Sequence, residues 1–174
     1  MVNKKTVLCC LLGAGMVFFT SSKKENRLNT YFDELNDLTE QELVGGGKLE
    51  ADSLKGKMLI LNFWASYDPA SRINSYELSR IRDQYSGSSF DGGDGLGIVS
   101  ISLDVFHSPL AKAIEADGVQ DFYHICDYKG AQSPLAQSFD VNRPVNLLVS
   151  SDGQIVARDF GTSTLNEILA MLTK

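Results

Sequence analysis

The sequence predicts one α/β domain, a three-layer sandwich in which helices cover both faces of a central mixed sheet. Three observations lead to this fold class. The chain has 174 residues, 43% of them hydrophobic, which suffices for one packed core but not for two of ordinary size. Segments with strand and helix patterns alternate along it. Towards the carboxyl terminus the alternation gives way to a hairpin that turns at Asp152-Gly153.

The first 22 residues have the pattern of a secretory signal peptide. A short basic start precedes an apolar run, residues 7–19, and small residues follow it. The run is shorter than the roughly 20 residues that a spanning helix needs, so a transmembrane anchor is the weaker alternative. Ser22 stands where a lipoprotein would carry a Cys, which argues against a lipid anchor. We therefore expect an exported protein of the periplasm or cell envelope, without a transmembrane span in the mature chain.

The rest of the chain divides into a polar segment, residues 23–44, and the predicted domain, residues 45–174. The formal net charge of the whole chain is -6, which disfavours nucleic acid as a partner, because acidic surfaces repel phosphate backbones. Loss of residues 1–22 leaves Cys126 as the only thiol. No intramolecular disulfide can then form, and the core alone must hold the fold.

The first strand and helix of the domain have clear local signals. The unbroken apolar stretch at residues 58–66 predicts a strand that is covered on both faces, as in sheets with parallel members. Asp68-Pro69 predicts the start of a helix, with Asp as the N-cap and Pro at the first helical position. We expect the apolar face of this helix to contain Ile73, Leu78, Ile81 and Tyr85.

The later elements follow in alternation. Residues 86–97 predict a solvated Gly-rich loop, whose Asp91 and Asp94 lack the acid spacing of an EF-hand. No metal site, dinucleotide site or other cofactor is expected. The remaining predicted elements are a strand at 98–105, a helix from about Pro109 to Asp117, a short strand near "FYHIC", a helix near "SPLAQSF", the hairpin "VNLLVSSDGQIVARDF" and a last helix, "STLNEILAMLTK".

Three stretches carry a resemblance to a known family. They are "LKGKMLILNFWAS", "WASYDPASR" and "SPLAQSFDVNRPVNLLVSSDGQIVARDFG". Together they resemble the thioredoxin-like proteins of the bacterial envelope, the TlpA/ResA type, which are related to the AhpC/TSA group. The resemblance covers roughly residues 45–174. It implies a thioredoxin-like three-layer sandwich and a cis peptide bond before Pro144.

The resemblance also implies that the redox cysteines of the family map onto Asp68 and Ser71. In the family, the first thiol lies at a helix N-terminus, where the helix dipole lowers its pKa. A carboxylate at position 68 suits capping and cannot exchange electrons, and the hydroxyl of Ser71 forms no disulfide. By the chemistry of the family, this chain is expected to be inactive as a disulfide reductase or peroxidase.

Other chemistry at the same position has weaker signals. A serine hydrolase would need a base near Ser71, for which His107 is the candidate, although a histidine in a surface loop is the simpler interpretation. A metal site at Asp68 and His107 would have only two scattered ligands. No catalytic residue is therefore assigned from the sequence.

Cys126 is the remaining candidate for redox chemistry. It lies on the predicted strand beside His124 and Asp127, and a buried hydrophobic role is the simpler interpretation. A carboxylate close to the sulfur would oppose formation of the thiolate. Mixed-disulfide chemistry with an external thiol remains an alternative.

The family resemblance further implies a recognition groove that does not depend on cysteines. Its residues here are Trp64, Tyr67, Asp68, Arg143 and Pro144, and an extended peptide or an envelope protein is the expected partner, bound by strand addition. One alternative is an atypical thiol-disulfide oxidoreductase or antioxidant protein that acts through Cys126 or through thiols of a partner. A third is a scaffold whose groove is closed by a pair between Arg143 and Asp68.

Overall fold

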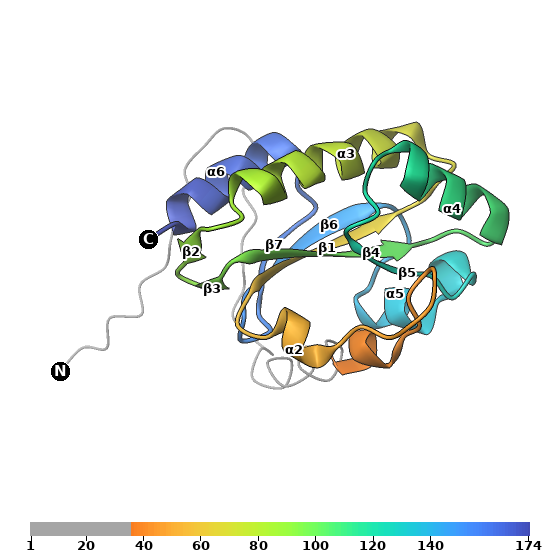
Figure 1. Cartoon of the computed structure of the whole chain (residues 1–174), viewed down its shortest axis with the longest axis horizontal. Helices are drawn as coiled ribbons and strands as arrows, with labels where there is room; N and C mark the ends of the chain where they lie inside the picture. Colours follow the sequence, from red (N-terminus) through yellow and green to blue (C-terminus); the bar gives the residue numbers. More distant parts are fainter. Residues whose placement is uncertain (1–35) are drawn as a thin grey trace.

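A five-stranded mixed sheet lies at the centre of the structure, a computed structural model that describes residues 36–174 (Figure 1). The strand order is β5-β4-β1-β6-β7. β4 and β5 run parallel to β1, whereas β6 is antiparallel to β1 and to β7, so the predicted mixed sheet is confirmed. The strands are β1 (Met58–Trp64), β4 (Leu96–Ser102), β5 (Tyr123–Ile125), β6 (Val145–Val149) and β7 (Ile155–Arg158).

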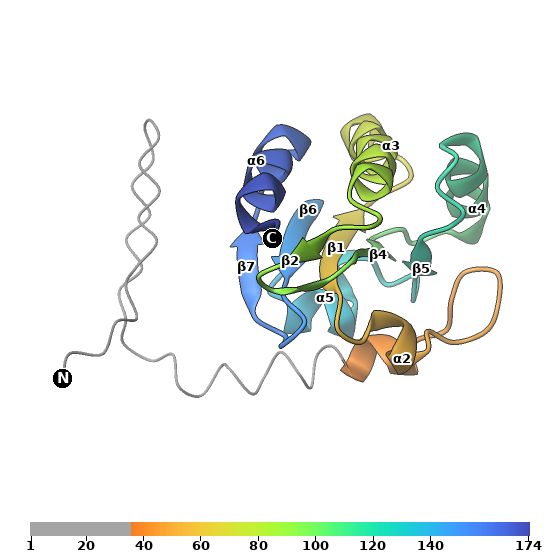
Figure 2. The ribbon, with the colours of Figure 1, turned by 60° about the vertical axis from the view of Figure 1, so that its left-hand side comes forward.

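Helices cover both faces of the sheet, which confirms the three-layer sandwich (Figure 2). We call the face covered by the first three helices below the α3 face and the opposite one the α5 face. The α3 face is covered by α3 (Pro69–Gln84), α4 (His107–Ala116) and α6 (Thr162–Leu172), and the α5 face by α2 (Ala51–Leu54), α5 (Pro134–Ser138) and the short 3-10 turn η1 (Gly130–Gln132).

β1 shows why its sequence is apolar without a break. All seven of its residues are buried, and successive side chains point to opposite faces of the sheet. Ile60 and Trp64 belong to the core cluster on the α3 face, whereas Leu61 and Phe63 belong to the cluster on the α5 face. The strand therefore contributes to both cores, as predicted.

The start of α3 is confirmed, but its buried face differs from the prediction. Its buried residues are Ser71, Ser75, Leu78 and Ile81. Ile73, expected in the core, has 62% of its surface exposed. Ile73 is two residues from both Ser71 and Ser75, which places it roughly 200° around the helix from each of them. Two buried serines thus take the place that periodicity alone would give to an isoleucine.

The Gly-rich segment, residues 86–97, is more ordered than predicted. It contains a small antiparallel pair, β2 (Ser89–Phe90) and β3 (Gly93–Asp94), and β4 begins at Leu96 rather than at residue 98. Phe90 is fully buried in the α3-face core. Gly93 has a φ of 156°, and a Cβ there would lie 2.8 Å from backbone atoms of the segment before β1. The glycine therefore permits a close backbone approach that fixes this hairpin.

The remaining elements agree with the predicted order. β6 and β7 form the hairpin, with Gly153 at a φ of 79° in its turn. α4 begins at His107, two residues earlier than predicted. The domain also includes residues before the predicted boundary at position 45, since Leu38 is fully buried in the α5-face core and Val44 N–H donates to the His124 carbonyl at 2.8 Å.

Most of the predicted amino-terminal features lie before residue 36, where the described part of the chain begins. The predicted signal peptide, residues 1–22, lies outside the described residues, and so does most of the polar segment 23–44. Within residues 36–174, no helix is both long enough and apolar enough to cross a membrane.

Candidate functional site

The turn between β1 and α3 presents Tyr67 and Asp68 at the carboxyl end of β1. The Asp68 carboxylate accepts hydrogen bonds from the Ser71 backbone N–H (3.0 Å) and from the Ser71 hydroxyl (2.6 Å). The bond from the hydroxyl is the main cause that lowers the pKa of Asp68, against a smaller opposing effect of burial. The anion-favouring start of α3 is therefore occupied by a carboxylate of the chain itself.

Asp104 fixes this turn through hydrogen bonds, a role that the sequence did not predict. Its buried carboxylate accepts from the Ser66 N–H (2.9 Å), the Ser66 hydroxyl (2.6 Å) and the Ser102 hydroxyl (2.6 Å). These bonds tie the end of β4 to the turn that carries Tyr67. An acid directly after an apolar strand, as in "ISLDV", was the available signal.

A cleft of about 700 Å³ lies beside this turn, between the start of α3 and the end of α4. Arg72 and Asp117 lie in it and form a two-pronged ion pair, with Arg72 Nε 2.8 Å from Asp117 Oδ2. Its other lining residues are Ser66, Tyr67, Pro69, Ile73, Tyr76, Glu115, Ala116 and Gly118.

The residues of the predicted groove differ in exposure and in their partners. Tyr67 is 70% exposed, whereas Trp64 is fully buried and offers no surface to a ligand. Arg143 forms its ion pair with Asp159, so the structure does not support the alternative of a groove closed by Arg143 and Asp68. Asp159 directly follows the end of β7.

Pro144 also differs from what the resemblance implies. No peptide bond in residues 36–174 is cis, so the bond before Pro144 is trans. The Pro144 carbonyl accepts from Arg143 Nη1 at 3.3 Å. Pro144 directly precedes β6, which pairs with β1 on the side opposite to β4. Val145 is in register with Phe63, so Pro144 lies near the carboxyl end of β1, and neither Arg143 nor Pro144 lines the α3–α4 cleft.

Cys126 directly follows β5 and is half-buried against the core of the α3 face. Its sulfur lies 3.8 Å from the Asp104 carbonyl oxygen. Burial is the main cause that raises the pKa of this thiol, and the carboxylates of Asp104 and Asp127 add to it, against an opposing bond with Ser102. The environment therefore favours the thiol over the reactive thiolate.

His107 and Ser71 have separate partners. The His107 ring stacks on Tyr128, with 3.5 Å between ring centroids, and the Ser71 hydroxyl donates to Asp68. The structure records no hydrogen bond between the two, so it gives no support to a serine hydrolase. Within the described part of the chain, no group of three Cys, His, Asp or Glu residues is placed to hold a metal ion.

A row of polar side chains crosses the α3 face of the sheet beneath α3. Asn62 is in register with Asn146 on β6 and with Ser100 on β4, and Ser100 is in register with His124 on β5. We call these four residues the polar row. α3 bonds to it from above, because Asn62 Nδ2 donates to the Ser75 hydroxyl at 3.0 Å. This row was not predicted, since its members lie far apart in sequence.

Asn74 of α3 adds a second link to the row. The side-chain amides of Asn74 and Asn146 exchange two hydrogen bonds, at 3.2 and 3.0 Å. Asn146 Nδ2 also donates to the Phe160 carbonyl at 3.1 Å. The first turns of α3 are therefore hydrogen-bonded to β1 and β6, in addition to being packed on them.

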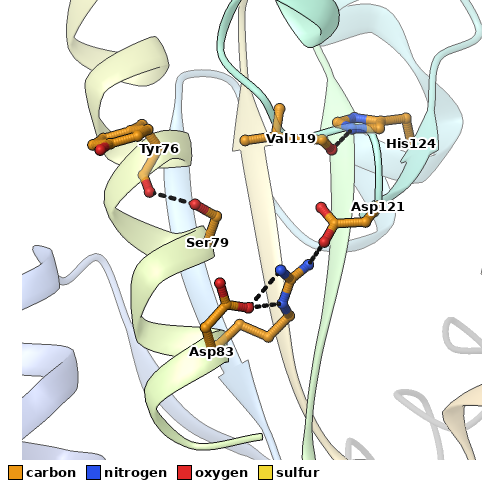
Figure 3. Close-up of polar contacts among 7 residues, drawn as sticks. Tyr76, Ser79, Asp83, Val119, Asp121 and His124 are labelled. Atoms are coloured by element: carbon orange, nitrogen blue, oxygen red, sulfur yellow. Dashed lines mark hydrogen bonds and ion pairs between the residues drawn. The ribbon is translucent and has the colours of Figure 1, made fainter.

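His124 ends the polar row on the β5 side. Its Nε2 lies 2.7 Å from the Val119 carbonyl (Figure 3), which requires a proton on Nε2 because a carbonyl only accepts. Burial lowers the pKa of His124, while Asp121 nearby acts in the opposite direction. The ring is therefore neutral, with an Nδ1 that has no hydrogen-bond partner among the described residues.

Arg82 attaches the loop after α4 to α3. Its guanidinium lies between the carboxylates of Asp83 and Asp121, both at 2.6 Å (Figure 3), and 5.3 Å above the ring centroid of Phe122. This contact fixes the loop that continues from the end of the cleft towards His124.

The order of the sheet, the two helical layers and the site at the carboxyl end of β1 together define a thioredoxin-like fold. No family model and no curated protein matches the sequence. Solved structures do match. The C-terminal domain of a protein assigned as a thiol-disulfide oxidoreductase from Bacteroides thetaiotaomicron is 31% identical, with 76% of this chain and 88% of that chain covered and a TM-score of 0.65.

Two further structures extend the comparison. A thiol-disulfide oxidoreductase from Bacteroides fragilis is 29% identical over 74% of this chain and 95% of its own, with a TM-score of 0.61. A thioredoxin-like protein from Parabacteroides distasonis is 25% identical over 74% and 90%, with a TM-score of 0.56. The chain belongs to the thioredoxin-like thiol-disulfide oxidoreductases, of the TlpA/ResA type, which confirms the resemblance seen in the sequence.

Proposed function

We propose that this chain is a redox-inactive member of its family and binds an extended segment of a peptide or envelope protein. The observation that carries the proposal is the start of α3. Where the resemblance places the first redox cysteine, Asp68 caps the helix through two hydrogen bonds from Ser71. Neither side chain contains sulfur, so this pair can form no disulfide and pass no electrons to one.

The surface around the turn supports binding. Tyr67 is exposed beside Asp68, and Ile73 and Tyr76 are exposed along the adjacent cleft. Contiguous apolar side chains at the surface are typical of interaction sites. The hydrogen bonds of Asp104 to Ser66 hold the turn in place, so Tyr67 is presented by a rigid support.

We further propose that the protein acts outside the cytoplasm, in the periplasm or cell envelope. The support is the pattern of residues 1–22, with a basic start, an apolar run and small residues before position 23. An oxidising compartment is also where partners with disulfides occur, although this chain needs none of its own.

The alternative, a one-thiol oxidoreductase that uses Cys126, has less support. A nucleophilic thiol is activated by a lowered pKa, whereas burial and two carboxylates raise that of Cys126. Reduction of insulin by dithiothreitol, followed by turbidity, separates the two functions. We expect no rate above background for the exported protein or for Cys126→Ser, beside an active thioredoxin. Activity that disappears in Cys126→Ser would overturn the redox-inactive assignment.

The mapping of the redox positions has its own test. The double variant Asp68→Cys with Ser71→Cys should fold and gain insulin reductase activity, because α3 would then offer a thiolate at its N-terminus. Asp68→Ala with Ser71→Ala is the matched control, since it removes both hydrogen bonds without adding sulfur. A folded double-cysteine variant that reduces no disulfide would contradict the mapping.

Binding itself is tested by photocrosslinking in cells. A benzoylphenylalanine placed at Tyr67 should give protein adducts, because this side chain is exposed at the turn. The same group at Met171, 59% exposed on α6, is the control position. Adducts of equal yield from both positions, or from neither, would contradict a binding role for the turn.

A further inference from the structure

We infer that the α3–α4 cleft accepts the cationic side chain of a lysine or arginine that lies within an apolar peptide segment. This inference rests on the proposed binding function and names the class of partner. The apolar walls of the cleft and its unbalanced negative charge favour such a basic side chain.

The walls of the cleft are formed by exposed apolar side chains. Seven large hydrophobic residues of the described chain are exposed, and three of them, Tyr67, Ile73 and Tyr76, line this one cleft. All three come from the turn before α3 or from its first two turns. The opposite wall is formed at the end of α4, where the lining residues include the small Ala116 and Gly118. The volume of about 700 Å³ fits a few side chains of an extended peptide.

The charges of the cleft do not balance. Three lining residues are charged, Arg72, Glu115 and Asp117. Arg72 and Asp117 neutralise each other through their two-pronged pair. The carboxylate of Glu115 is exposed and has no ion pair in the described part of the chain, which leaves the cleft with one negative charge.

Neighbouring groups reinforce that sign. Asp68, at the edge of the cleft, has a lowered pKa and stays ionised at neutral pH. The whole chain has a net charge of -6, so the surrounding field also favours a cation. Lys112 is on the preceding turn of α4 and is not among the residues that line the cleft.

The chemistry of the walls suits a cation more than any other ligand. Tyr67 and Tyr76 present aromatic rings, whose faces attract lysine and arginine. Glu115 supplies the opposite charge, and Ile73 supplies apolar contact for the neighbours of the basic residue in the peptide. An acidic peptide would instead meet Glu115 and Asp68 with like charge. Arg143 and Pro144, which strand addition would use, are not among the residues that line the cleft.

The test uses three amidated, acetylated pentapeptides with a central residue between two leucines and terminal glycines. The central residue is arginine, citrulline (its uncharged analogue of the same shape) or glutamate. Each is titrated into the ¹⁵N-labelled exported protein and followed by amide chemical shifts. We expect shifts at Tyr67, Ile73, Tyr76 and Glu115, and binding of the arginine peptide about fivefold tighter than that of the citrulline peptide.

Matched variants assign this selectivity to the cleft. Glu115→Gln should bring the ratio of the two dissociation constants close to one, because it removes the unpaired charge without changing shape. Glu167→Gln, the same change at an exposed position of α6, should leave the ratio unchanged. Tyr76→Leu retains apolar bulk but removes an aromatic face, and should reduce the ratio in part.

The outcomes separate this inference from the proposed function. Equal binding of the arginine and citrulline peptides, or shifts confined to residues around Pro144, would overturn the cationic preference. In that case, crosslinks from Tyr67 would still support the binding function. Selectivity that persists in Glu115→Gln would also overturn the inference, since the charge would then come from elsewhere. If no peptide causes amide shifts and position 67 gives no crosslinks, the proposed binding function would be overturned as well.

Discussion

The two faces of the sheet are built on different principles. The α5 face is covered by a large apolar cluster, which includes Leu61, Phe63 and Phe139. The α3 face has an apolar cluster of similar extent, but the polar row crosses it from β6 to β5 beneath α3. On the α3 face, hydrogen bonds between side chains of the sheet and of α3 add to the apolar packing.

This difference coincides with the location of the site. The turn with Tyr67 and Asp68 continues directly into α3, whose Asn74 and Ser75 bond to the polar row. Hydrogen bonds fix the position of a helix along and around its axis, whereas apolar packing tolerates small shifts of it. We attribute to the polar row the role of positioning α3, and with it the turn and one wall of the cleft.

Polar side chains on the α3 face also reduce stability where they are buried without a hydrogen-bond partner. Four buried polar side-chain atoms in residues 36–174 have no hydrogen-bond partner, and all belong to that face or to α6 above it: Trp64 Nε1, Ser100 Oγ, His124 Nδ1 and Asn166 Oδ1. A buried polar group without a partner costs roughly 1–3 kcal/mol. These unpaired groups offset part of the stability that burial gives to the α3 face.

The largest effect is expected from a change on the α5 face. Phe63→Ala should lower the free energy of unfolding by about 3–5 kcal/mol, because it removes a fully buried ring that packs 5.7 Å from Phe139, centroid to centroid. Urea denaturation measures it. Tyr67→Ala, an aromatic truncation at the surface, is the control and should change stability little. Equal losses in both would contradict the assignment of stability to this face.

A smaller loss is expected from the polar row. Asn146→Ala should cost about 1–3 kcal/mol, since it removes the donor to Asn74 Oδ1 and to the Phe160 carbonyl. A double-mutant cycle with Asn74→Ala isolates the pair, and we expect a coupling of about 1 kcal/mol. Additive losses would show that the two amides do not act together.

The start of α3 should contribute less again. Asp68→Ala removes the cap of the helix and should cost about 1 kcal/mol, whereas Asp68→Asn should retain most of it, because an amide oxygen can also accept from Ser71 N–H. Thermal unfolding of the three proteins at neutral pH measures the difference. A loss as large in Asp68→Asn as in Asp68→Ala would assign the effect to charge and not to capping.

The smallest effect is expected from the titration of His124. Because burial lowers its pKa below the ordinary 6.5, the unfolded chain binds this proton more readily than the folded one. Neutral His124 therefore contributes fully to the free energy of unfolding above the ordinary pKa of histidine. This contribution is lost as the pH falls through the lowered pKa of the folded state. Asp68, with a pKa below 3.8, does not titrate in that range.

Measurement of unfolding free energies between about pH 7.5 and about pH 5 tests this titration. The slope should decrease in His124→Gln and remain in His107→Gln, whose side chain lies at the surface. A slope that is the same in all three proteins would exclude His124 as its source.

Local patterns in the sequence predicted much of the fold. The apolar stretch of β1, the cap at Asp68 and the Asp-Gly turn of the hairpin depend on residues close in sequence, and all three are confirmed. Periodicity failed at Ile73 because the sheet beneath α3 offers a polar row, which accepts serine and asparagine instead. Composition failed at Phe90, because a Gly-rich segment can still anchor one aromatic ring in the core.

The sequence by itself determined the fold class, the order of the elements and the absence of sulfur from the start of α3. Only the tertiary structure decided that Trp64 is buried, that Arg143 pairs with Asp159, and that Glu115 lines the same cleft as two tyrosines. The physical reason is that these relations join segments far apart in the chain. They depend on strand register and on the rotation of α3 over the sheet, which the packed core fixes as a whole.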